Sequence, residues 1–117
     1  MKKKIAILGS TGSIGKTLLS ILSKDRNSEI SLLTADRNYV DLIKQAKKFK
    51  VKNLILTDKK SFNILKKKTK NLDINIFNNF DNLKKILKKK VDYTMSSITG
   101  VAGLYPTIEI IKYTKRN

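Results

Sequence analysis

Three glycines spaced three residues apart carry the clearest chemical signal in the sequence. They are Gly9, Gly12 and Gly15, in the segment ILGSTGSIGKT. Glycines that follow a strand and open a helix in this way form the turn that holds the pyrophosphate of a dinucleotide. The first permits a sharp exit from the strand, the second lets backbone N–H groups approach the pyrophosphate, and the third lets the helix pack closely on the sheet. Thr11 and Ser13 add hydroxyl donors at the helix N-terminus, where the helix dipole favours an anion.

A phosphate-binding P-loop is a second interpretation of the same segment, because Gly15-Lys16-Thr17 is the ending of that motif. A P-loop has four residues between its first glycine and the Gly-Lys pair, and Ser10 occupies the position of that first glycine. Asp92 could imitate the acidic residue of a nucleotide hydrolase, but it lies at the start of the fifth predicted strand, where it is poorly placed to hold a magnesium ion. We therefore favour the dinucleotide turn. A glycine-rich turn that binds nothing remains the alternative.

A polar turn, Asp36-Arg37-Asn38, follows the second predicted strand, about 20 residues beyond the glycines, where the ribose of the adenosine half is selected. An acidic residue there accepts from the 2′-hydroxyl of NAD, whereas a basic residue holds the 2′-phosphate of NADP. Arg37 has the planar fork suited to phosphate, and Asn38 can donate to it. Asp36 would repel a phosphate unless it turned outward or contributed through its backbone. We expect NADP, and the alternative is that Asp36 and Arg37 are an ordinary solvated pair.

The elements that must position these turns alternate along the chain. Strand-like patterns alternate with helical ones, which predicts an α/β fold, a Rossmann-like doubly wound parallel sheet with helices on both faces. Ligands of such sheets bind beyond the carboxyl ends of the strands. No linker divides the chain, so residues 1–117 are expected to form one domain. The expected strands are 3–8, 29–34, 53–57, 73–77 and 91–96, and the expected helices are 13–22, 39–49, 59–68, 79 or 81 to 89, and 104 or 106 to 114.

A second loop rich in glycine and small residues, 96–107, follows the fifth predicted strand. Small residues at the carboxyl edge of a sheet permit close approach of the backbone. The loop could form the floor of a nicotinamide pocket. An ordinary crossover made of small residues fits equally well.

Composition excludes several classes of protein. The chain contains no cysteine and no histidine, which excludes disulfides, thiolate nucleophiles and the commonest zinc ligands, and a cytoplasmic location fits this composition. No apolar run approaches the length of a membrane span. The formal net charge of +17 could indicate a nucleic-acid binder. However, lysine, asparagine and isoleucine are all in excess and share A/T-rich codons, and no aromatic residues interleave with the lysine runs, so we expect no nucleic-acid partner.

With these residues in view, the chain resembles the N-terminal part of the 1-deoxy-D-xylulose 5-phosphate reductoisomerases. The segment Ile5–Gly15 matches the first motif of that family, and Gln45, Phe49 and the loop Gly100–Thr107 agree with it in order and spacing. Arg37 matches the basic preference of the family, whereas Asp36 replaces a glycine found in some members. The resemblance implies that the NADPH phosphates are lined by Thr11, Gly12, Ser13 and Ile14, and that the adenosine side is met by Asp36, Arg37 and Asn38.

The resemblance also implies the reaction of the complete enzyme. That reaction is a metal-assisted rearrangement of 1-deoxy-D-xylulose 5-phosphate, followed by hydride transfer from NADPH to give 2-C-methyl-D-erythritol 4-phosphate. The Mg or Mn ligands, the lid and the substrate-phosphate site of the family are absent, so no catalytic or metal-binding residue is assigned here. We expect a truncated, cofactor-binding part of an enzyme that could form a homodimer. The alternative is a stand-alone dinucleotide-binding module without catalysis.

Overall fold

The computed structural model describes residues 2–81, 83–87, 91–96 and 114–116 of the chain. In these residues strands and helices alternate from residue 3 to residue 96. No helix among them has the length and apolar character that a membrane crossing requires. The elements are β1 (Lys3–Leu8), α1 (Ser13–Leu22), β2 (Ser28–Ala35), α2 (Tyr39–Phe49), β3 (Asn53–Leu56), α3 (Lys59–Lys68), β4 (Asn75–Phe77), α4 (Leu83–Ile86), β5 (Val91–Ser96) and β6 (Thr114–Arg116).

The strands of the described residues form one parallel sheet in the order β4-β3-β2-β1-β5-β6. The chain first builds outward from β1 through β2 and β3 to β4, then returns to the other side of β1 with β5. This reversal of strand order lies between β1 and β5. Because the strands are parallel, their carboxyl ends meet at one edge of the sheet, and the loops after β1, β2 and β3 are gathered there.

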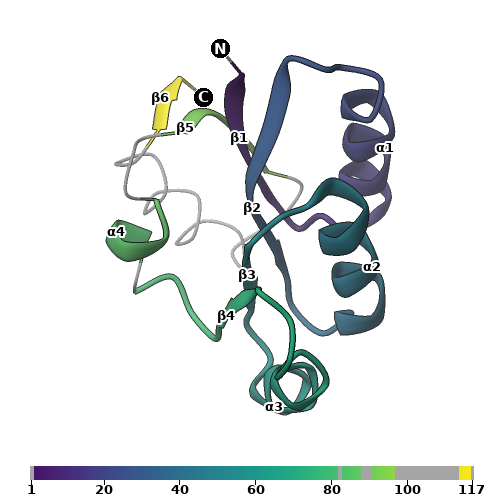
Figure 1. Cartoon of the computed structure of the whole chain (residues 1–117), viewed down its shortest axis with the longest axis vertical. Coiled ribbons are helices and arrows are strands. Elements are labelled where there is room, and N and C mark those ends of the chain that lie inside the picture. The colour runs from purple at the N-terminus through teal and green to yellow at the C-terminus, as the bar shows by residue number, and fades with distance from the viewer. Residues whose placement is uncertain (1, 82, 88–90, 97–113, 117) are drawn as a thin grey trace.

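The two faces of the sheet are covered by different helices, as Figure 1 shows with α1 and α2 on one side and α4 on the other. Alternate residues of β1 point to opposite faces, so Ile5 and Ile7 join one core cluster and Ala6 and Leu8 join the other. The first core cluster contains Leu19, Leu42 and Leu65 from α1, α2 and α3, and the second core cluster contains Phe80, Leu83, Ile86 and Leu87 from α4 and its flanks. The predicted doubly wound α/β sheet with helices on both faces is therefore confirmed.

Helices α1, α2 and α3 and strands β1 and β5 have the predicted bounds, and the other described elements differ at their ends. Helix α4 begins only at Leu83, because Asn79 accepts a hydrogen bond of 3.0 Å from the Asp81 backbone and forms a turn before it. Residues 104–113 of the predicted last helix lie outside the described residues. Its predicted end at Thr114 is wrong, because Thr114 pairs with Val91 as the first residue of β6.

Candidate functional site

The glycine turn after β1 is fixed to the end of the neighbouring strand β2. Gly9 has a φ of 72°, in the left-handed region that favours glycine. Its backbone N–H donates to the Thr34 hydroxyl at 3.0 Å, and the Ser10 N–H donates to the Thr34 carbonyl at 2.9 Å. Thr34 is buried and Gly9 is half-buried, so the two contacts are largely shielded from water. The exit from β1 is therefore held in one geometry by a residue that the sequence analysis did not single out.

The glycines at positions 12 and 15 serve different purposes. A Cβ atom at Gly15 would collide with the carbonyl oxygen of Gly9 and lie 2.6 Å from the Cα of Ser10, so only glycine lets α1 pack this closely on the turn. Gly12 has a φ of −76°, and a Cβ there would meet the Gly9 oxygen at an ordinary 3.7 Å. Packing among the described residues therefore requires Gly15 but leaves room for a Cβ at Gly12.

The N-terminus of α1 differs from those of α2 and α3 in its side-chain capping. Asn38 accepts a hydrogen bond from the first turn of α2, and Asp58 does the same for α3. Among the residues that the structure describes, no side chain caps α1, and no acidic residue lies in its first turn. The first N–H groups of a helix have no partner within the helix, so an uncapped N-terminus presents donors to the surroundings. Ile14, in this first turn, is 58% exposed although it is apolar.

Side chains of helix α2 contact both the glycine turn and α1. The side-chain amide of Gln45 donates to the carbonyl oxygen of Ser10 at 2.9 Å. The Lys16 ammonium lies 2.9 Å from the Asp41 carboxylate, which also accepts from the side-chain amide of Asn38 at 2.9 Å. These hydrogen bonds, from Lys16 first and Asn38 second, lower the pKa of Asp41. The charged pair thus connects the helix that follows the glycine turn to the helix that follows the polar turn.

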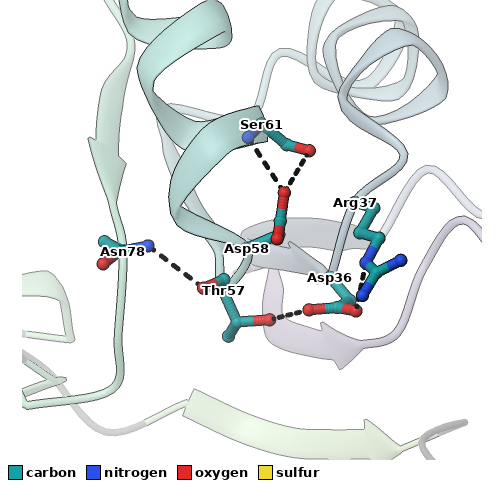
Figure 2. A network of polar contacts seen from close by, with 6 residues as sticks. All are labelled: Asp36, Arg37, Thr57, Asp58, Ser61 and Asn78. Atoms are coloured by element: carbon teal, nitrogen blue, oxygen red, sulfur yellow. Dashed lines mark hydrogen bonds and ion pairs between the residues drawn. The ribbon is translucent and has the colours of Figure 1, made fainter.

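The polar turn after β2 presents two charged side chains to solvent. Asp36 and Arg37 are 71% and 80% exposed, and their carboxylate and Nε lie 3.6 Å apart. The second carboxylate oxygen of Asp36 accepts from the Thr57 hydroxyl at 2.7 Å, as Figure 2 shows. Asn38 uses its side-chain oxygen to cap α2. The Asp36 carboxylate is therefore turned toward the end of β3, and Arg37 extends beside it.

The glycine turn and the polar turn follow adjacent strands and lie at the same edge of the sheet. Asp92 lies at the opposite edge, where its carboxylate accepts from the Lys4 backbone at 2.8 Å, so the P-loop interpretation gains no acidic partner from it. Of the predicted loop 96–107, only Ser96 falls within the described residues. In those residues no group of three or more acidic, histidine or cysteine side chains could hold a metal ion.

Comparison with known proteins places this arrangement in a family. The family model described as 1-deoxy-D-xylulose 5-phosphate reductoisomerase matches residues 5–116. The curated reductoisomerase of Pelagibacter ubique (strain HTCC1062) is 55% identical over 116 residues, which make up 97% of this chain and 30% of that protein. That of Thermodesulfovibrio yellowstonii is 40% identical over 115 residues, with the same shares of 97% and 30%. The chain thus spans about 30% of the length of these relatives.

Solved structures agree with the sequence relatives. A 1-deoxy-D-xylulose 5-phosphate reductoisomerase from Zymomonas mobilis in complex with NADPH has a TM-score of 0.85 and 28% identity, covering 99% of this chain and 32% of its own. A reductoisomerase in complex with NADPH, fosmidomycin and magnesium has a TM-score of 0.80 and 30% identity, covering 92% and 27%. A family match over almost the whole sequence and a shared fold together establish that the chain belongs to the 1-deoxy-D-xylulose 5-phosphate reductoisomerase family.

Proposed function

We propose that residues 1–117 form the NADPH-binding domain of a 1-deoxy-D-xylulose 5-phosphate reductoisomerase. The observation that carries this proposal is the open, uncapped N-terminus of α1 above Gly12, beside a turn that four hydrogen bonds and one ion pair hold in place. A relative with the same fold was solved in complex with NADPH.

Thr11, Gly12, Ser13 and Ile14 are the residues to which we assign the pyrophosphate. Packing among the residues that the structure describes gives no reason for glycine at position 12, since a Cβ there would make only an ordinary contact with the Gly9 oxygen. We infer that the backbone at Gly12 carries no side chain so that a ligand can approach it from outside. The first-turn N–H groups of α1 and the helix dipole provide the donors and the positive potential that a pyrophosphate needs.

We assign the adenosine side to Asp36, Arg37 and Asn38. Arg37 is exposed at the end of β2, next to the strand that carries the glycine turn, and its guanidinium can bind the 2′-phosphate through two nitrogens. Asn38 shapes the turn by capping α2, and its amide nitrogen is already engaged with Asp41. This chemistry favours NADPH over NADH.

The complete enzyme would rearrange and reduce 1-deoxy-D-xylulose 5-phosphate to 2-C-methyl-D-erythritol 4-phosphate, with Mg or Mn bound by residues outside this chain. NADPH, when bound, supplies the hydride for the reduction. The role of the described residues is to bind and orient that donor. A cytoplasmic location and a homodimer of the complete protein belong to the same proposal, and the mass of the native protein in solution would test the second.

Titration of the 117-residue chain with NADPH, followed by the fluorescence of the nicotinamide, tests the proposal. Backbone amide resonances recorded during the titration should move at residues 11–14 and 36–38 and stay in place at the opposite edge of the sheet. Absence of binding, or movement confined to other residues, would refute the assignment. The intact mass of the native gene product separates the alternatives: a mass near 13.3 kDa would favour a stand-alone module, and a much larger one the complete enzyme.

A further inference from the structure

The carboxylate of Asp36 is held on the side of β2 that faces away from the glycine turn. Strand β2 lies between β1 and β3, and the glycine turn follows β1. Thr57, which follows β3, donates its hydroxyl to one carboxylate oxygen of Asp36 at 2.7 Å. The other oxygen faces Nε of Arg37 at 3.6 Å, the inner nitrogen of that guanidinium (Figure 2). One oxygen of the acid is therefore bound on the side of β3, and the other faces Arg37.

The backbone of Thr57 is itself held by hydrogen bonds, which keeps the residue beside Asp36. Its backbone N–H donates to the Ala35 carbonyl at 3.1 Å, and its carbonyl accepts from the Asn78 amide at 3.2 Å. The next N–H, that of Asp58, donates to the Asp36 carbonyl at 2.9 Å. The ends of β2, β3 and β4 are thus joined, and Thr57 cannot move away from Asp36 without breaking these contacts.

An acid at the end of β2 has two opposite effects on cofactor choice. A free carboxylate that turns toward the glycine turn can accept from the ribose hydroxyls of NADH, and it repels the 2′-phosphate of NADPH. A carboxylate bound on the side of β3 neither accepts from the ribose hydroxyls nor repels the 2′-phosphate. Arg37 can then bind that phosphate. We propose that Thr57 is a positioning residue that sets the preference for NADPH by holding Asp36 away from the ribose site. The inference rests on the proposed function of the chain.

Binding of NADPH and NADH to three forms of the 117-residue chain tests the inference, with fluorescence of the nicotinamide as the readout. In Thr57→Val the ratio of the NADH Kd to the NADPH Kd should fall about fivefold, because a lost hydrogen bond to a charged group frees the carboxylate. Thr57→Ser keeps the hydroxyl and should stay within about twofold of the parent ratio. Circular dichroism confirms that each form is folded, which is expected because Thr57 is exposed.

The Asp36→Asn background shows whether the effect passes through the acid. There, Thr57→Val should leave the ratio unchanged, since no charge remains to be held. An unchanged ratio in Thr57→Val alone, or an equal fall in both backgrounds, would overturn the inference while NADPH binding by the parent chain still supports the proposed function. A parent chain that binds neither cofactor would overturn both.

Discussion

The side-chain amide of Gln45 on α2 donates a hydrogen bond of 2.9 Å to the carbonyl oxygen of Ser10 in the glycine turn. The other side-chain atom, Oε1, is buried and has no hydrogen-bond partner within the described part of the chain. The chain therefore uses Gln45 as a donor, and that donor fixes the turn from a helix that begins beyond the next strand.

Replacing Gln45 by leucine should loosen the glycine turn. The Ser10 carbonyl loses its donor, which lowers the free energy of unfolding by about 1 kcal/mol and weakens NADPH binding about fivefold. Gln45→Glu should be worse, because a carboxylate would then face the carbonyl oxygen. Chemical denaturation and cofactor titration measure the two effects, with Lys44→Leu on the exposed side of α2 as the control. Parent-like binding by Gln45→Leu would contradict the positioning role.

Replacing Gly15 by alanine should destabilise the fold. The added methyl group would collide with the Gly9 carbonyl and press on Ser10, so α1 must move off the turn. Overpacking of this kind lowers the free energy of unfolding by about 2 kcal/mol. Denaturant unfolding should show this loss in Gly15→Ala and little change in Gly12→Ala, where the methyl group fits. Similar unfolding midpoints for the two variants would show that the close approach of α1 is not required.

Replacing Gly12 by valine separates folding from binding. The variant should stay folded, with a Tm close to that of the parent, because within the described part of the chain the nearest contact of a Cβ at this position is the Gly9 oxygen at 3.7 Å. It should lose measurable NADPH binding, because the branched side chain occupies the space that we assign to the pyrophosphate. Thermal unfolding and titration are measured on the same sample. Retained affinity would remove the pyrophosphate from this position.

Replacing Arg37 by alanine tests the choice between the two cofactors. The loss of charge-assisted hydrogen bonds to the 2′-phosphate should weaken NADPH about tenfold or more, while NADH, which lacks that phosphate, changes little. Arg37→Lys keeps the charge without the planar fork, so its affinity for NADPH should lie between those of the parent and of Arg37→Ala. An equal loss for NADPH and NADH would assign Arg37 a structural role only.

Stability in acid should depend on the cap of α3. Hydrogen bonds from the Ser61 hydroxyl and backbone N–H lower the pKa of Asp58, and the charges of Arg37 and Lys60 lower it further. An aspartate with a lowered folded pKa stabilises the fold above its unfolded pKa of about 3.9, and this contribution is lost as the pH falls through the folded value. Tm should therefore decline below about pH 4.

The matched variant for this effect is Asp58→Asn. Asparagine caps helices well but does not titrate, so its Tm should decline less steeply over the same pH range. The difference should shrink at high salt, because the side chain is solvated and the charges of Arg37 and Lys60 are screened. Parallel curves for Asp58→Asn and the parent would show that the Asp58 carboxylate contributes no acid sensitivity.

Local patterns were sufficient to predict the order and type of most elements. Helices α1, α2 and α3 have apolar residues at helical spacing, β1 and β3 contain short apolar runs, and β2 is rich in leucine and isoleucine, so each of these elements carries its own signal. Strand β6 has three residues and carries none, because so short a segment shows no period and exists only through its pairing with β5. Helix α4 was predicted too long for a related reason, since a local turn at Asn79 replaces its first part.

The residues of the candidate site likewise fall into those that could be recognised from the sequence and those that could not. The glycines and the polar turn could be recognised in sequence because their spacing is local. Thr34, Asp41 and Thr57 could not, because each acts on a residue far from it along the chain: Thr57 and Asp36 are 21 residues apart, and Thr34 and Gly9 are 25 apart. Such partners become visible only when adjacent strand ends are brought together.

The reversal of strand order at β1 also sets the order in which the chain can assemble during synthesis. The buried residues of the first core cluster all lie within residues 5–76, although Tyr93 and Met95 of β5 also pack against it, so most of the layer of β1 to β4 with α1, α2 and α3 can close as this continuous segment emerges. The second core cluster needs α4 and Val91, and β1 meets β5 through contacts such as that between Lys4 and Asp92, 88 residues apart. Until those residues are synthesised, the other face of the same sheet stays exposed to water and can make non-native contacts. Its apolar residues include Ala6, Leu8, Leu32 and Ile55.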